Sequence, residues 1–232
     1  MFALALPLLL VSLVLAGCAG RQLKSEGEPV MDASASASRL MAATLPAGPR
    51  RTTFTWNLRE GRTRLSGQGV ARYEAPDHLR LDLFGPRGET YLSAALVDGR
   101  FRLPPTARDA IALPSASLLW AALGIFQPPT AARLVSVTVS GDVTSVRYGA
   151  PDGEMYDFRF MDSPRASLLS SVERAGTNGI TESLELQYDD SGVLLTANYR
   201  NWADFRDLEI HVEKTEDATS FQDEIWLPGG SN

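Results

Sequence analysis

The chain has 232 residues, of which 44% are hydrophobic and 22% are charged, and its formal net charge is −6. This length and composition fit one large domain or two small ones with a sizeable core. The acidic balance argues against nucleic-acid binding, because neutralising phosphates requires clustered Lys and Arg residues. The single cysteine and two histidines exclude a disulfide framework and a Cys- or His-rich metal centre.

Residues 1–17, MFALALPLLLVSLVLAG, form an uncharged apolar segment that ends directly before Cys18. Such a short run, ending in small residues, is typical of a secretory signal rather than of a membrane span. The sequence Leu15-Ala16-Gly17-Cys18 resembles the lipobox of bacterial lipoproteins, whose signal is cleaved before a cysteine that then carries fatty acyl groups such as palmitate. The alternative is a cysteine buried in an ordinary signal or in an inner-membrane helix. The resemblance implies a lipoprotein signal peptide at 1–17 and lipidation of Cys18.

The residues after the cysteine bear on where the protein is anchored. Several acyl chains on one residue give near-permanent membrane attachment. Ala19 follows Cys18, whereas by resemblance to enteric bacteria an Asp there would favour the inner membrane, so the resemblance implies the outer membrane, facing the periplasm. Residues 18–48 then contain the lipidated cysteine, a polar tether and, in the Ala- and Ser-rich stretch from 31, a short helix.

From Arg51 onward, apolar and polar residues alternate, which is the pattern of half-buried β-strands. The apolar members of the clearest runs are Leu79, Leu81 and Leu83; Tyr156, Phe158 and Phe160; Leu184, Leu186 and Tyr188; Val193, Leu195, Ala197 and Tyr199; and Leu208, Ile210 and Val212. A sheet with one apolar face must curl to cover that face. We therefore expect residues 49–232 to form a single, mainly β domain, an open, curled antiparallel β-barrel of about 11–12 strands.

One predicted strand, residues 62–73, has small residues on one face. Gly67, Gly69 and Ala71 share that face with Leu65 and Tyr73. Small inward-facing residues leave volume that other side chains do not fill, which would produce a cavity. The alternative is that the glycines mark bulges where the sheet bends.

An apolar helix interrupts the strands in the middle of the chain. Helical spacing relates Leu118, Leu119, Ala122, Leu123 and Phe126. Ser115 or Ser117 is a suitable N-cap, and Gly124 with Pro128-Pro129 ends the helix. We expect this helix to act as a lid or plug of the barrel, although the pattern also fits a helix packed on the outside of the sheet.

The sequence offers no support for catalysis. It contains no nucleophile elbow, P-loop, dinucleotide-binding glycine motif or HExxH motif. Asp77 and His78 could orient a base, and Glu209, His211 and Glu213 could share a metal, but both groups are more simply read as solvated strand residues. We therefore predict that the protein is not an enzyme, with no catalytic residues, no cofactor and no metal.

Two stretches, YEAPDHLRLDLFGPRGETYLSAALVDGRF (Tyr73–Phe101) and LPSASLLWAALGIFQPP (Leu113–Pro129), resemble LolB-like proteins of the LolA/LolB lipoprotein-carrier superfamily. In that family an Arg- and Leu-rich strand leads into a Pro-x-Gly loop, followed by a strand, a hairpin and a helix with a Leu-Trp type pair. The resemblance implies an open barrel whose apolar interior accepts acyl chains of lipids or lipoproteins. It also implies a soluble periplasmic carrier as a partner.

The resemblance assigns residues to three parts of such a carrier. The implied cavity lining is Leu79, Leu81, Leu83, Tyr156, Phe158 and Phe160. The implied lid helix contains Leu118, Leu119, Trp120 and Leu123. The implied membrane-facing loop is Pro86, Arg87 and Gly88. In LolB this loop carries an exposed apolar residue, and Arg87 at that position can touch anionic head groups but cannot wedge between acyl chains.

The sequence leaves two functions of different class. The first is a membrane-anchored periplasmic lipoprotein that carries or accepts lipids or lipoproteins at the outer membrane. The second is a non-enzymatic envelope lipoprotein that uses a filled barrel as a structural or protein-interaction module. A hydrolase acting on envelope substrates would need an acid/base site that the sequence does not reveal. Whether the interior is vacant discriminates the first two.

Overall fold

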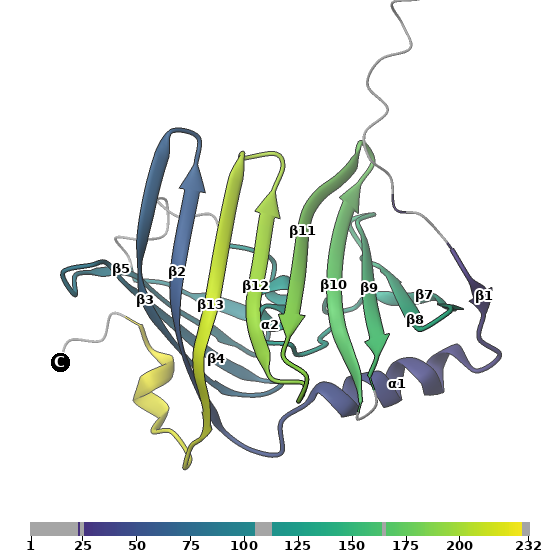
Figure 1. Ribbon diagram of the computed structural model, residues 1–232, viewed down its shortest axis with the longest axis horizontal. Helices are drawn as coiled ribbons and strands as arrows, with labels where there is room; N and C mark the ends of the chain where they lie inside the picture. Colours follow the sequence, from purple (N-terminus) through teal and green to yellow (C-terminus); the bar gives the residue numbers. More distant parts are fainter. Residues whose placement is uncertain (1–22, 24–25, 105–112, 164–165, 229–232) are drawn as a thin grey trace, which may run out of the picture.

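The protein is built around one curled antiparallel sheet (Figure 1), and its hydrophobic core lies on the concave face. The structure is a computed structural model that describes residues 23, 26–104, 113–163 and 166–228. The predicted signal peptide and Cys18 lie outside the described residues. The predicted open, curled and mainly β architecture is confirmed, with 13 strands in the described sheet against the 11–12 expected.

The strands fall into two series along the chain. The first series is β1 (Glu28–Pro29), β2 (Arg50–Glu60), β3 (Thr63–Glu74), β4 (His78–Phe84), β5 (Thr90–Val97) and β6 (Arg100–Arg102). The second is β7 (Arg133–Ser140), β8 (Val143–Gly149), β9 (Met155–Asp162), β10 (Ser167–Gly176), β11 (Gly179–Tyr188), β12 (Leu194–Asn201) and β13 (Arg206–Asp217). The order across the sheet is β1-β7-β8-β9-β10-β11-β12-β13-β2-β3-β4-β5-β6.

The two series join where β13 pairs with β2, so chain segments about 150 residues apart form the middle of the sheet. Register shifts occur in several pairs, for example between Val212 and Lys214 and between Leu169 and Ser171. Each shift adds a local bend and increases the twist of a sheet that twists already. The sheet therefore curls, and β6 and β1 lie at opposite edges of it.

Helix α1 (Ala33–Thr44) precedes β2 and packs on the concave face below β7 and β10. Asp32 caps it, because its carboxylate accepts a hydrogen bond of 2.9 Å from the Ala35 N–H. Ala37 and Leu40 belong to the core, and the helix lies in the Ala- and Ser-rich stretch before the first long strand. Together with β1, α1 makes residues 28–44 part of the folded unit.

Helix α2 (Ala116–Ala121) follows β6 and precedes β7 in the chain, so it links the two series of strands. It crosses the concave side of the sheet. Ser115 is its N-cap, with the hydroxyl accepting from the Leu118 N–H, and Gly124 turns the chain just after the helix with a φ of +77°. Leu118, Trp120 and Ala121 are at most 2% exposed. The helix therefore lies inside the curl, and the alternative of a helix outside the sheet is excluded.

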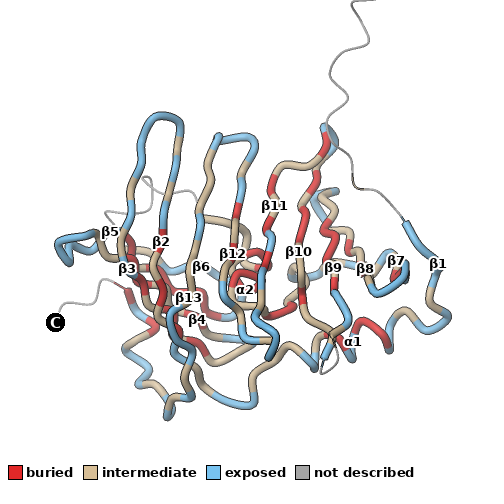
Figure 2. Tube along the Cα trace, viewed as in Figure 1, coloured by how far each residue is buried: buried red, intermediate tan, exposed pale blue. Residues whose placement is uncertain are grey.

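The outer face of the sheet is covered at one place by the C-terminal segment. The short helix η2 (Asp223–Trp226) lies against β4 and β5, where Trp226 packs on Ala95 and Val97. The Arg80 guanidinium donates a hydrogen bond of 2.7 Å to the Ile225 carbonyl. In Figure 2 the middle parts of the strands are buried, whereas the β2–β3 and β12–β13 hairpin ends at the top are exposed.

The core has two main parts on the two sides of α2. Under β7–β12 the interior is filled by aromatic rings, with Phe126 centred 4.7 Å from Phe158 and 5.1 Å from Phe160. All three side chains are fully buried. Under β2–β5 the rings are fewer and the packing is around Phe54, Trp56 and Trp120.

The packing of Phe126 leads to a test of the filled half. Phe126→Ala removes a fully buried ring and leaves a cavity, so we expect the free energy of unfolding to fall by about 3–5 kcal/mol. Val193→Ala, at a side chain that is 50% exposed, should change it by less than about 0.5 kcal/mol. Urea denaturation measures both, and a loss below about 1 kcal/mol for Phe126→Ala would contradict the close packing described here.

Candidate functional site

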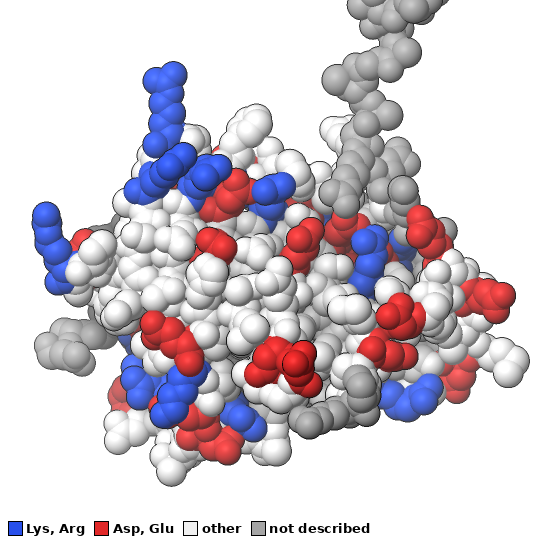
Figure 3. All heavy atoms as spheres, viewed as in Figure 1, with Lys and Arg blue, Asp and Glu red and all other residues white. Residues whose placement is uncertain are grey.

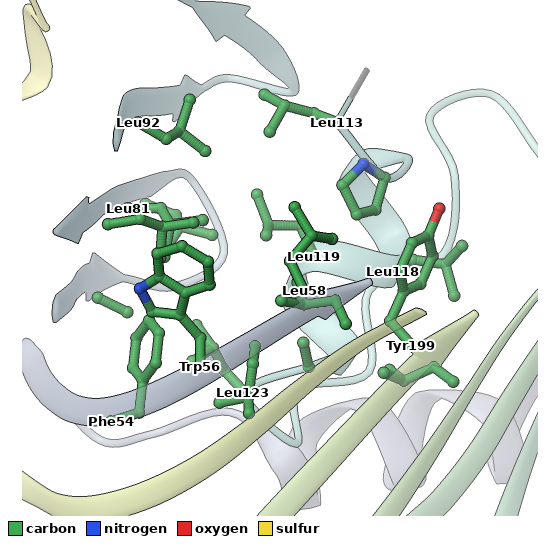
Figure 4. Close-up of a pocket in the computed structure, with 18 of the residues that line it drawn as sticks. Phe54, Trp56, Leu58, Leu81, Leu92, Leu113, Leu118, Leu119, Leu123 and Tyr199 are labelled. Carbon is green, nitrogen blue, oxygen red and sulfur yellow. The ribbon is translucent and has the colours of Figure 1, made fainter. Parts of the chain in front are cut away.

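A cavity of about 110 Å³ lies between the concave face of the sheet and α2, in the half of the core formed by β2–β5 (Figure 4). Figure 4 shows Phe54, Trp56 and Leu81 on one side of it and Leu118 and Tyr199 on the other, with Leu119 between. Its apolar lining comprises Phe54, Trp56, Leu58, Ala71, Leu79, Leu81, Leu83, Leu92, Leu113, Pro114, Leu118, Leu119, Ala122, Leu123, Leu184, Leu208, Ile210 and Val212. An apolar enclosure of this kind favours hydrocarbon over water.

The small residues of β3 do not create this cavity in the way the sequence indicated. A Cβ on Gly69 would lie 2.3 Å from the Phe54 ring, so that ring occupies the space above the glycine. A Cβ on Gly67 would meet the Phe84 carbonyl oxygen, because the main chain approaches closely there. The β2–β3 register runs without a shift, so the glycines do not mark bulges in that pair either. Of the small residues on this face, only Ala71 borders the cavity.

At one end the cavity lining is polar and reaches solvent, since the Glu60 side chain there is 43% exposed. Trp56 is only 1% exposed, whereas Tyr91, whose ring is centred 5.3 Å from it, is 38% exposed. Arg206 donates to Glu60 at 2.5 Å, and the Tyr199 hydroxyl donates to Glu182. We call Glu60, Tyr91, Tyr199 and Arg206 the polar collar, since all four line the cavity at this end.

Behind the collar, an ion-pair network holds Tyr199 in place. Glu182 is 3% exposed and accepts hydrogen bonds from Tyr199 and from Arg174, which also donates to Glu154 at 2.6 Å. Burial raises the pKa of Tyr199, and the hydrogen bond with Glu182 raises it further. The hydroxyl therefore stays protonated near neutral pH and acts as a hydrogen-bond donor.

The structure places the expected cavity and lid residues in different parts of the core. Leu79, Leu81 and Leu83 of β4 line the cavity, as do Leu118, Leu119 and Leu123 of the α2 segment. Trp120 packs edge-on against Tyr73, with ring centroids 6.3 Å apart, in the same half of the core. Tyr156, Phe158 and Phe160 of β9 lie in the other half, packed around Phe126.

Several lining residues were not expected from the sequence. Phe54, Trp56 and Leu58 come from β2, and Leu208, Ile210 and Val212 come from β13. The alternation in these strands does show which residues face inward. It does not show that β13 pairs with β2, which is what brings both strands to the cavity.

The loop expected to face the membrane is the turn between β4 and β5. Pro86, Arg87 and Gly88 are exposed, and the Arg87 N–H donates to the Glu89 carboxylate at 3.0 Å. Cys18, the expected lipidation site, lies outside the described residues. No helix among the described residues is long and apolar enough to cross a membrane.

Both histidines contact neighbouring side chains. The His78 ring packs against Trp226, with centroids 5.2 Å apart, and His211 contacts Glu209 at 3.1 Å on the exposed outer face of β13. Within the described ranges, no group of three or more His, Cys, Asp or Glu side chains is placed to hold a metal ion.

Solved structures show the same architecture. A LolA superfamily protein from Nitrosomonas europaea matches with a TM-score of 0.56 at 9% identity, covering 84% of this chain and 96% of that one. The chain has a LolA-like fold. An outer membrane lipoprotein-sorting protein domain from Vibrio parahaemolyticus matches with a TM-score of 0.54 at 10% identity, covering 82% and 94% of the two chains. No protein-family model and no curated protein sequence matches the chain described here.

The raised pKa of Tyr199 predicts a pH dependence for this LolA-like fold. Above a pH of about 10 the unfolded chain loses the tyrosine proton while the folded chain keeps it. The free energy of unfolding should therefore fall as the pH rises from about 10 toward the higher folded-state pKa. Tyr199→Phe should make this alkaline loss smaller, as measured by thermal unfolding between pH 8 and 11. An equally steep loss in the variant would contradict the assignment.

Proposed function

We propose that this protein is a membrane-anchored periplasmic lipoprotein whose apolar cavity binds acyl chains, carrying or accepting lipids or lipoproteins at the outer membrane. The observation that carries the proposal is the apolar cavity under β2–β5 and β13, which α2 covers on one side and whose lining reaches solvent at the polar collar. Hydrocarbon gains most from a dry apolar lining, and a polar rim suits the headgroup end of the same molecule.

The size of the cavity supports a mechanism with a moving cover. A volume of about 110 Å³ is below the roughly 300–1,000 Å³ typical of pockets for small ligands. A long acyl chain therefore needs α2 to move away from the sheet. Leu119 and Leu123 are only partly buried, and Gly124, three residues after the end of the helix, is a candidate hinge.

The proposed role is binding rather than catalysis. The cavity lining is mostly hydrocarbon, and the charged groups of the collar are in an ion pair rather than aimed at a reacting atom. The location in the periplasm at the outer membrane rests on the lipobox-like sequence and on Ala19, together with the likeness of the fold to lipoprotein-sorting proteins.

One observation favours the alternative, a structural or protein-interaction module with a filled barrel. The half of the interior under β7–β12 is packed with aromatic rings and includes Tyr156, Phe158 and Phe160, which a larger cavity would have exposed. Acyl-chain binding to the other half decides between the two functions.

Filling the cavity tests the proposal. Ile210 is half-buried on β13 and lines the cavity, so Ile210→Trp should occupy the space and lower the affinity for a fluorescent palmitate analogue by about tenfold or more. The protein for this titration is the soluble form, residues 19–232, which lacks Cys18 but contains every described residue.

The matched control is His211→Trp, at the next residue of the same strand. Its side chain is 45% exposed on the outer face, so binding should be unchanged. Thermal unfolding of both variants checks that each is folded. Equal binding by wild type and Ile210→Trp, or no binding by the wild type, would remove the support for an acyl-chain carrier.

The proposed anchor has its own test. The full-length chain, expressed in a bacterial host with radiolabelled palmitate, should incorporate label and sediment with membranes. Cys18→Ser should incorporate none, because it lacks the sulfur that carries the acyl groups in the lipoproteins it resembles. Equal labelling of the Cys18→Ser chain would refute lipidation at this residue.

A further inference from the structure

The turn between β12 and β13 displays two aromatic side chains to solvent. Phe205 is 79% exposed and Trp202 is 42% exposed. Phe205 has a φ of +50°, a conformation that bulky residues rarely adopt, and its carbonyl accepts a hydrogen bond of 3.3 Å from the Gly61 N–H. The Trp202 N–H donates to the Thr181 carbonyl at 2.9 Å. Main-chain hydrogen bonds to β11 and to the β2–β3 turn thus fix the backbone of this turn, and both rings are exposed on it.

The adjacent turn between β2 and β3 supplies positive charge. The two turns are neighbours because Arg206 pairs with Glu60 in the sheet, and both lie at the top of Figure 1. We call residues 59–64 and 200–207 together the arginine-aromatic tip. It contains five arginines and three acidic residues, a net charge of +2 in a chain whose net charge is −6. Figure 3 shows Lys and Arg side chains gathered over this end of β2 and β3.

The acidic residues of the tip already have partners. Glu60 pairs with Arg206 at 2.5 Å, Asp207 pairs with Arg200 at 2.6 Å, and Asp204 accepts from the Asn201 amide at 3.1 Å. The remaining arginines, Arg59, Arg62 and Arg64, make no ion pair with any residue that the structure describes. These three guanidinium groups are available to an anionic partner.

Arginine and aromatic side chains together are typical of protein surfaces that contact a lipid bilayer. Trp and other aromatic rings concentrate at the interface of a bilayer, where part of the ring is apolar and part is hydrated. Unpaired arginines near a surface are attracted to anionic lipid headgroups. Arg200 lies over the Trp202 ring, 4.7 Å from its centroid, which places cation and ring on one surface.

We propose that the arginine-aromatic tip docks on the surface of an anionic bilayer, with Phe205 and Trp202 in the interface and Arg59, Arg62 and Arg64 on lipid phosphates. Because Glu60 and Arg206 belong both to the tip and to the polar collar, the cavity then opens toward the bilayer. The tip then makes the membrane contact that the resemblance to LolB-like proteins implied for Pro86, Arg87 and Gly88. The docking does not depend on what the cavity holds.

Vesicle flotation of the soluble form, residues 19–232, tests this docking. We expect binding to vesicles of phosphatidylcholine mixed with phosphatidylglycerol, and much weaker binding to phosphatidylcholine alone or in high salt. The double variant Trp202→Ser, Phe205→Ser should bind the anionic vesicles about tenfold more weakly or worse. Arg62→Ser, at an exposed turn, should weaken binding roughly fivefold.

The matched control is Val193→Ser, Leu195→Ser. These side chains are 50% and 44% exposed at the opposite end of β12, so vesicle binding should be unchanged. Undiminished binding by the Trp202/Phe205 variant, or an equal loss in the control, would overturn the proposal. So would a dimer of the wild-type soluble form that the variant converts to monomer, since the tip would then contact a second copy. Acyl-chain binding by the tip variant should stay intact, which separates this proposal from the proposed function.

Discussion

The structure depends on one constraint: a sheet that is apolar on only one face has to keep that face away from water. Here the sheet curls, α1 packs on its concave side near β7 and β10, and α2 with the residues after it covers what the curl leaves open. The cover is uneven. Phe126, just beyond Gly124, fills the half under β7–β12 with aromatic packing, whereas Leu119 and Leu123 only partly fill the half under β2–β5. The cavity lies where the cover is incomplete.

Much of this fold could be predicted because local sequence patterns indicate it. The alternation of Leu79, Leu81 and Leu83 shows a strand with one buried face, and Ser115 and Gly124 mark the ends of α2. The rest depends on contacts between distant residues. Phe158 and Phe160 alternate just as the leucines of β4 do, and only the position of Phe126 decides that they pack in a filled core rather than beside a cavity. No local pattern shows that β13 joins β2.

The polar end of the molecule illustrates the same limit. Glu60 and Arg206 are 146 residues apart and look like ordinary strand-end charges in the sequence, yet they form an ion pair at the cavity opening. Phe205 has no periodic partner, so nothing in the sequence marks it as an exposed ring beside Gly61. Together these contacts orient the molecule: the apolar lining lies deep between the strands, the polar collar lies above it, and the arginine-aromatic tip lies beside the collar. An amphiphile that leaves a bilayer at the tip would meet the tip first, then the polar collar and last the apolar lining.

The central claim is that the space under α2 accepts hydrocarbon. Native mass spectrometry of residues 19–232, purified from the periplasm of a bacterial host and then incubated with a triacylated peptide, tests it most directly. The account predicts a bound species, either a co-purified lipid or one added peptide per chain. A bare polypeptide mass both before and after incubation would contradict the claim and leave a fold whose interior serves only to hold the sheet together.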